Sequence, residues 1–111
     1  MDNGILKSIK TQLSLMPEDE SFDNELVIYI NASFSILTQL GVGPQIGFSI
    51  TGYDETWDDY QVDMVQENMA KQLVYLRVKI LFDPPANSSF AKAIEEQINN
   101  LEWRLRLQAE V

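Results

Sequence analysis

Apolar side chains return every three or four residues along most of this chain, which is the spacing of one face of an α-helix. The clearest case runs from Met64 to Pro85 and predicts one long helix that stops at Asp83-Pro84-Pro85, because neither proline has an N–H to donate. One face carries Val65, Met69, Leu73, Leu76 and Ile80. A second apolar set widens that face: Val74, Tyr75, Val78, Leu81 and Phe82. A helix that is apolar nearly all round is buried on more than one side, so we expect the other helices to pack against this one.

A second strong pattern predicts a helix that begins near Ser21 and ends at Leu40. Its inward stripe consists of Leu26, Ile30, Phe34, Leu37 and Leu40. Either Ser21 or Asp23 can accept hydrogen bonds from the first turn as an N-cap. Gly41 follows the last residue and suits the left-handed conformation that ends many helices.

Two further helices lie at the ends of the chain. A short one is predicted from Asn3 to Leu15, with Lys7 and Lys10 off its apolar face. A last one is predicted after Pro85, where the serines of a polar turn can act as its cap. The apolar stripe of this last helix is Phe90, Ile94, Ile98, Leu101 and Leu105. Glu102 and Arg106 lie four residues apart in the order that favours an ion pair.

Residues 42–53 interrupt the helical pattern. Glycines at 41, 43, 47 and 52 surround two short apolar pieces, and Phe48 to Thr51 alternates apolar and polar positions as a strand does. We therefore expect an exposed loop or a short β-hairpin outside the core. Thr56 and Asp59 then match a capping box that opens a brief helical turn. The predicted fold is all-α, a small bundle of about four helices with this loop or hairpin between the second helix and the long central helix.

The composition predicts one soluble helical domain over residues 1–111 and excludes several chemistries. The chain has 111 residues with 45% hydrophobic side chains, and it contains no cysteine and no histidine. Disulfides and thiolate sites are therefore excluded, and the commonest general base and metal ligand are missing. The N-terminus lacks a cationic start followed by an apolar block, and no apolar run reaches the roughly 18 residues that span a membrane.

The charge distribution argues against binding of nucleic acid. The net charge is −9, and no Lys or Arg occurs between Thr11 and Ala70. The same stretch contains the acids Glu18, Asp19, Glu20, Asp23, Glu25, Asp54, Glu55, Asp58, Asp59, Asp63 and Glu67. Phosphate binding needs clustered cations. This acidic stretch is either an ordinary solvated surface or a surface that repels a polyanion.

The acidic run from Asp54 to Asp63 does not match a metal or catalytic site. A calcium loop that began at Asp54 would need glycine at its sixth position and glutamate at its twelfth, where the chain has Asp59 and Val65. Asp58 and Asp59 are adjacent at a helix start and point in different directions, so stabilisation of the helix dipole explains them. The sequence therefore predicts no catalytic residue, no metal site, no cofactor and no enzymatic activity.

Trp103 is the residue most suggestive of a partner. It falls off the apolar stripe of the last helix and is flanked by Arg104 and Arg106. It is either a partly buried core residue or an anchor for another chain, since Trp and Arg dominate interface hot spots. The doubly apolar central helix favours the second reading, because a chain this short has few helices with which to cover two faces.

An ordered series of segments resembles the small head–tail connector proteins of long-tailed bacteriophages, also called neck adaptor or head-completion proteins. The series is Phe22-Asp23-Asn24-Glu25-Leu26, Ile30-Asn31, Leu40-Gly41-Val42-Gly43, Thr56-Trp57-Asp58-Asp59-Tyr60, Tyr75-Leu76-Arg77-Val78-Lys79, Leu81-Phe82-Asp83-Pro84-Pro85 and Glu102-Trp103-Arg104-Leu105. No single motif among these is diagnostic. The resemblance covers the chain from about Leu6 to Val111.

This resemblance implies a structural virion protein of the neck, made in the host bacterial cytoplasm. Family members form a ring, commonly twelve-fold, that attaches to the portal, extends the DNA channel and contacts the next neck or tail protein. They dock on the portal largely through C-terminal segments, here the region of Trp103, Arg104, Arg106 and Val111. DNA would pass through without specific binding, and no membrane would be involved.

A channel that does not retain DNA needs a wall that repels phosphate. Our candidates for this wall are Asp54, Glu55, Asp58 and Asp59, because they flank the glycine-rich segment. The alternative to a connector is a small cytosolic helical module that binds a partner helix in an open apolar groove.

Overall fold

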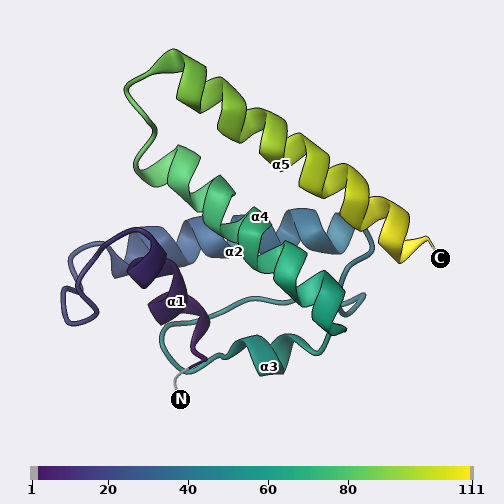
Figure 1. Cartoon of the computed structure of the whole chain (residues 1–111). Helices are drawn as coiled ribbons and strands as arrows, with labels where there is room; N and C mark the ends of the chain where they lie inside the picture. Colours follow the sequence, from purple (N-terminus) through teal and green to yellow (C-terminus); the bar gives the residue numbers. More distant parts are fainter. Residues whose placement is uncertain (1–2, 111) are drawn as a thin grey trace.

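Helix α4 (Met64–Phe82) lies at the centre of the molecule and packs against both α2 (Asp23–Gln39) and α5 (Ser88–Ala109) (Figure 1). A computed structural model of the chain describes residues 3–110. The predicted central helix is thus confirmed, together with its end before the two prolines. Two helices of the same chain cover the wide apolar arc of α4. No second subunit is therefore needed to bury this arc.

The described residues are all-α, with four longer helices and the single turn α3 (Trp57–Tyr60), and none of them forms a strand. Every helix contributes to one apolar core. Its helical members are Ile5, Leu6, Ile9, Leu26, Ile30, Phe34, Leu37, Trp57, Tyr60, Met69, Ala70, Leu73, Val74, Val78, Ile98, Leu101 and Leu105. The predicted stripes are confirmed except at their ends, where Val65, Leu81 and Phe90 are exposed.

Helix α1 (Ile5–Gln12) is shorter at both ends than the predicted helix. At its start, the Ile5 N–H donates to the Glu55 carbonyl and the Trp57 N–H donates to the Asn3 carbonyl, each at 3.0 Å. This short antiparallel contact ties the first residues to the start of α3. At its end, Ser14 has a φ of 63° and turns the chain away.

The start of α2 differs from the predicted cap. Phe22 occupies the N-cap position and no side chain accepts a hydrogen bond there, so neither Ser21 nor Asp23 is the cap. The Asp23 carboxylate is instead bound by side chains from other segments. The Phe22 ring packs edge-on against Phe82 with 5.2 Å between ring centroids. Gly41 adopts the predicted left-handed conformation beyond the end of the helix, with a φ of 90°.

The glycine-rich segment is a loop rather than a hairpin, and part of it enters the core. Val42 and Ile50 are fully buried, and Phe48 packs against Phe34 with 4.9 Å between ring centroids. The Asn31 side chain accepts from the Ile50 N–H at 2.7 Å and donates to the Ile50 carbonyl at 2.9 Å. The predicted exposure holds for residues 44–46, but the expectation that the segment lies outside the core is wrong for Val42 and Ile50. The amide of Asn31 takes the place of a strand partner for Ile50.

The predicted capping box at α3 is confirmed, whereas the predicted caps of α2 and α5 are wrong. Thr56 and Asp59 form the predicted capping box at α3. The Asp63 carboxylate accepts from the Gln66 N–H at 2.8 Å at the start of α4. At α5 the cap is Asn87, whose side-chain oxygen accepts from the backbone N–H groups of Ser89 and Phe90, and the predicted serine caps are not used.

Candidate docking and channel-facing sites

The outer end of α5 exposes an aromatic and an aliphatic side chain on the same helical face. Trp103 is 59% exposed and Leu107 is 44% exposed. They are four residues apart, while Leu101 and Leu105 of the same turns are buried against the core. Trp103 is therefore an exposed side chain outside the apolar core, and its role as an anchor stays a prediction.

Two arginines accompany this face, and the predicted ion pair of α5 is replaced by another one. Arg104 and Arg106 are both exposed. Glu102 accepts from the Arg77 guanidinium at 3.0 Å, which joins α5 to α4, instead of pairing with Arg106 along the helix. The last predicted docking residue, Val111, lies outside the described residues. The structure thus places Trp103, Arg104 and Arg106 together on the terminal turns of one helix.

The four predicted channel-lining acids lie together at the start of α3, but they have different local roles. Glu55 accepts from the Thr51 hydroxyl at 2.9 Å and the Gly52 N–H at 3.4 Å. Asp59 accepts from the Thr56 N–H at 2.9 Å within the capping box. These two carboxylates therefore maintain the local fold.

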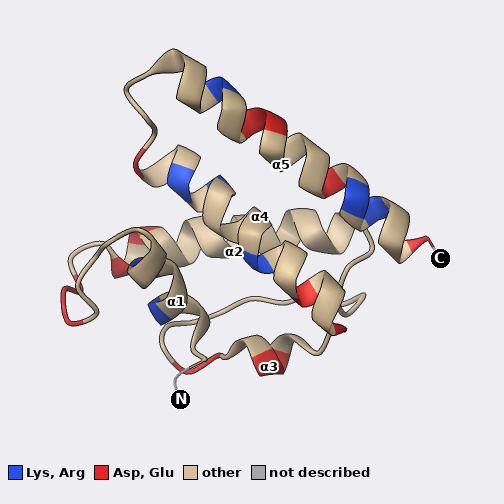
Figure 2. Cartoon of the chain, viewed as in Figure 1, with Lys and Arg blue, Asp and Glu red and all other residues tan. Residues whose placement is uncertain are grey.

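Burial raises the pKa of Glu55, but hydrogen bonds from Thr51 and Gly52 lower it more, so that the pKa of this carboxyl lies below its ordinary value of 4.5. Asp54 and Asp58 are exposed side chains. Figure 2 shows the acids as red segments on and just before α3. Asp54 and Asp58 are therefore the two members of the predicted set that take no part in these hydrogen bonds, and their role towards DNA stays a prediction.

A buried ion cluster that the sequence did not predict lies where α1 meets α2. Lys10 is fully buried, and its Nζ donates to the Asp23 carboxylate at 2.8 Å and to the Tyr53 hydroxyl at 2.6 Å. It also donates to the Asp19 carbonyl at 2.6 Å and to the Pro17 carbonyl at 3.1 Å. The Tyr53 hydroxyl in turn donates to Asp23 at 2.5 Å.

This cluster shifts the pKa of two of its members upward. Burial lowers the pKa of Lys10, but its bonds to Asp23 and Tyr53 raise it more, so the pKa lies above the ordinary 10.5. Burial and the bond to Asp23 raise the pKa of Tyr53 above 10.0, although Lys10 opposes the shift. The cluster joins three segments that lie far apart in the chain. Helical spacing places Lys10 off the apolar face and therefore gave no sign that this side chain is buried.

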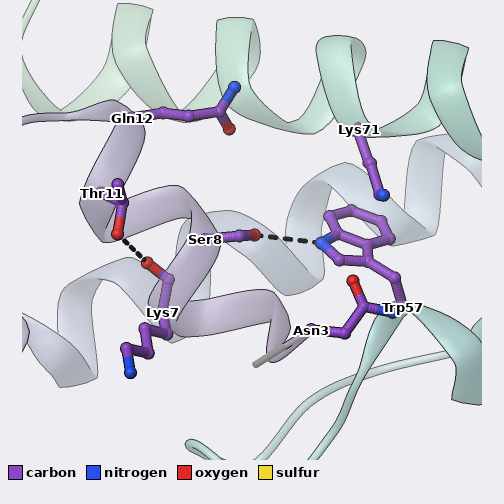
Figure 3. Close-up of a pocket in the computed structure, with 7 residues that line it drawn as sticks. All are labelled: Asn3, Lys7, Ser8, Thr11, Gln12, Trp57 and Lys71. Carbon is purple, nitrogen blue, oxygen red and sulfur yellow. Dashed lines mark hydrogen bonds between the residues drawn. The ribbon is translucent and has the colours of Figure 1, made fainter. Parts of the chain in front are cut away.

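A shallow pocket of about 410 Å³ lies between α1, α3 and α4 (Figure 3). Its lining residues are Asn3, Lys7, Ser8, Thr11, Gln12, Trp57 and Lys71. The Trp57 Nε1 donates to the Ser8 hydroxyl at 3.0 Å, and the Lys71 ammonium lies 5.6 Å from the centroid of the indole ring. Lys71 also pairs with Glu67 at 3.0 Å. The lining residues Ser8 and Lys71 thus hold Trp57 in place.

Neither a metal-ion site nor a membrane-spanning helix is present in residues 3–110. Within that range no cluster of three or more acidic side chains is placed to hold a metal ion. None of the helices there is both long and apolar enough to cross a lipid bilayer.

Comparison with known proteins adds one match. The family model described as phage connector protein matches residues 5–111 of the chain. No curated protein and no solved structure matches the chain significantly.

Proposed function

Since this chain belongs to the phage connector protein family, we propose that it is a structural protein of the virion neck that forms a ring on the portal and joins the capsid to the tail. The family match carries the proposal, because it spans all five helices rather than one motif. By resemblance we expect a twelve-fold ring. It would extend the DNA channel and contact the next neck or tail protein on its other side.

The exposed end of α5 supports contact with the portal. Trp103 and Leu107 form a small apolar face, with Arg104 and Arg106 beside it. Aromatic residues and arginine are enriched among the residues that carry binding energy at interfaces. We propose that this face docks on the portal protein, and Val111, outside the described residues, stays a predicted docking residue.

The acidic start of α3 supports passage of DNA without binding. Asp54 and Asp58 are exposed, and no cation follows Lys10 in the sequence until Lys71. An acidic wall repels the phosphate backbone over a Debye length of about 8 Å at physiological salt. We propose that these two acids face the channel. A non-catalytic role agrees with the absence of cysteine and histidine from the sequence.

The alternative of a cytosolic module that binds a partner helix requires an open apolar groove. The widest apolar helix, α4, is instead covered by α2 and α5. We therefore favour the connector.

Negative-stain electron microscopy of the purified protein mixed with its portal tests the proposed function. We expect added density in the form of a ring at one end of the portal. The free protein can be a monomer that the portal assembles, so a monomer in solution is compatible with the proposal. A protein that neither binds the portal nor joins portal-bearing particles contradicts it.

A further inference from the structure

Beyond the first turn, which carries Asp23 and Glu25, the outward face of α2 and the segment after it carry no charged side chain. No Asp, Glu, Lys or Arg occurs between Glu25 and Asp54, although 23% of the residues of this chain are charged. In Figure 2, α2 is tan after its first turn and the following segment is tan as far as the acids before α3.

This charge-free face is exposed and continuous along α2. Ile28, Ala32, Ser35 and Gln39 are all exposed, and Ile28 is 65% exposed. They follow one another at steps of four, three and four residues, so they lie along one side of the helix. The buried residues of α2 lie on its other side.

A shallow hollow extends the face beyond the helix. It has a volume of about 440 Å³ and is lined by Ser35, Thr38, Gln39, Ile46, Gly47, Phe48 and Ser49. Ile46 is 96% exposed at the tip of a turn in which the Gly47 N–H donates to the Pro44 carbonyl at 2.9 Å. The turn thus presents an aliphatic side chain to solvent at the edge of a hollow without charge.

We propose that this charge-free face is the surface through which adjacent copies of the chain contact each other in the ring, an inference that rests on the proposed function. Each copy carries a net charge of −9, so copies placed side by side repel one another wherever their acids approach. A partner of opposite charge would gain most from a charged surface. For a partner with the same charge, electrostatic repulsion is smallest where both contact surfaces are neutral. A second copy of the chain is therefore the occupant that this face favours.

The composition of the face agrees with that of an interface core. Charged residues are depleted in the cores of protein–protein interfaces, because a charge buried there without a partner is strongly unfavourable. A closed ring needs a heterologous contact, in which this face meets a different patch of the neighbouring copy. The neighbouring patch must also be low in charge.

Site-specific photocrosslinking in assembled particles tests which protein covers the face. Because the chain has no cysteine, Ser35→Cys introduces one thiol that a benzophenone maleimide labels uniquely. Particles that incorporate the labelled protein are irradiated, and the adducts are identified by mass spectrometry. We expect an adduct between two copies of this chain. Gln97→Cys, at an exposed position of α5, provides the background yield.

Three outcomes are distinguished. An adduct between two copies at a yield above that of Gln97→Cys supports the inference. An adduct only with another virion protein, or a yield of self-adduct equal to the background, overturns it while the proposed function stands. Particles that never incorporate even the unmodified protein overturn the proposed function, and the inference fails with it.

Lysine substitutions on the same face test its energetic role. Ile28→Lys and Ser35→Lys should each lower the number of copies per particle by about tenfold or more, because an unpaired charge would be buried between copies. Lysine reduces the net negative charge, so a loss cannot arise from greater repulsion between copies. Gln97→Lys is the matched control and should assemble normally. Normal assembly of both α2 variants, with folding verified by circular dichroism, overturns the inference.

Discussion

The ammonium group of Lys10 lies 2.8 Å from the carboxylate of Asp23, and the two side chains are 1% and 16% exposed. Tyr53 donates to the same carboxylate at 2.5 Å. This buried cluster connects α1, the first residue of α2 and the end of the glycine-rich segment. The relative positions of these three segments therefore depend on one positive charge.

Replacement of Lys10 by methionine should destabilise the protein by about 3 kcal/mol, because it leaves the buried Asp23 carboxylate without its cation. Two backbone carbonyls also lose their donor. Urea unfolding followed by circular dichroism measures the change. Lys92→Met, at an exposed position of α5, is the control and should stay within about 0.5 kcal/mol of the parent. Equal stabilities of the two variants would show that the cluster contributes little.

Alkaline solution should lower the free energy of unfolding. The pKa of Lys10 and that of Tyr53 are both raised in the folded protein, and burial also raises the pKa of Tyr60. The folded state therefore binds these protons more tightly than the unfolded state, whose groups titrate near 10.5 for lysine and 10.0 for tyrosine. This stabilisation is fully present below pH of about 10 and is lost as the pH rises towards the folded-state pKa values.

Urea unfolding at a series of pH values from neutral to strongly alkaline provides the measurement. Lys10→Met removes one of the three groups, so its stability should fall less steeply above pH of about 10 than that of the parent. A parent profile that is flat through this range would exclude the linkage.

Substitution of Gly43 by alanine should destabilise the protein by about 2 kcal/mol, since a residue with a side chain is strained at a positive φ and the added atom also meets a neighbour. Gly43 has a φ of 85°, and a Cβ at this position would lie 2.7 Å from the Tyr60 ring. Gly52 is the matched control, because no atom lies within 4 Å of a Cβ placed there. Thermal unfolding of both variants checks the difference, and equal melting temperatures would contradict it.

The double substitution Trp103→Ala with Arg104→Ala should leave the protein folded but unable to complete heads. Both side chains are exposed, so the free energy of unfolding should change by no more than about 0.5 kcal/mol per position. Complementation of a connector-deficient phage measures head completion. Phe90→Ala, 66% exposed near the other end of α5, is the control and should complement normally. Normal assembly by the double variant would argue against an anchor at Trp103.

Replacement of both Asp54 and Asp58 by lysine should slow or block release of DNA from assembled particles. Each added cation recurs once per subunit around a ring, so the contacts with phosphate multiply and become strongly dependent on salt. Glu55 and Asp59 are left unchanged, because both carboxylates support the local fold.

Release of DNA is measured in vitro at low and moderate salt. The control carries lysine at Glu95 and Glu96, two exposed acids of α5, and should release DNA at the parental rate. Parental rates for the Asp54 and Asp58 variant at both salt concentrations would show that these acids do not line the channel.

Most features that depend on near neighbours in the chain were predicted well, apart from the caps of α2 and α5. The central helix and its stop at Asp83, the stripe of α2 and the capping box of Thr56 with Asp59 were all correct. Each involves residues within a few positions of one another. Helical periodicity and capping geometry relate exactly such residues, so the spacing of side chains contains the information.

Features that depend on pairs of distant residues were predicted poorly. Glu102 pairs with Arg77 of α4 rather than with Arg106 of its own helix. The amide of Asn31 binds the backbone of Ile50, which draws the glycine-rich segment into the core. No local rule distinguishes these partners from the alternatives, because the choice depends on how helices cross.

The sequence by itself determined where helices form, which of their faces are apolar, and that no histidine or cysteine chemistry is possible. Only the tertiary structure decided that Lys10 is buried, that Trp103 is exposed, and that the neutral side of α2 faces solvent with Ile46 beside it. The physical reason is the range of the interactions involved. Hydrogen bonds within a helix and the burial of a helical face follow from residues a few positions apart, whereas the burial of one particular lysine requires oxygen atoms from three segments to meet at one point.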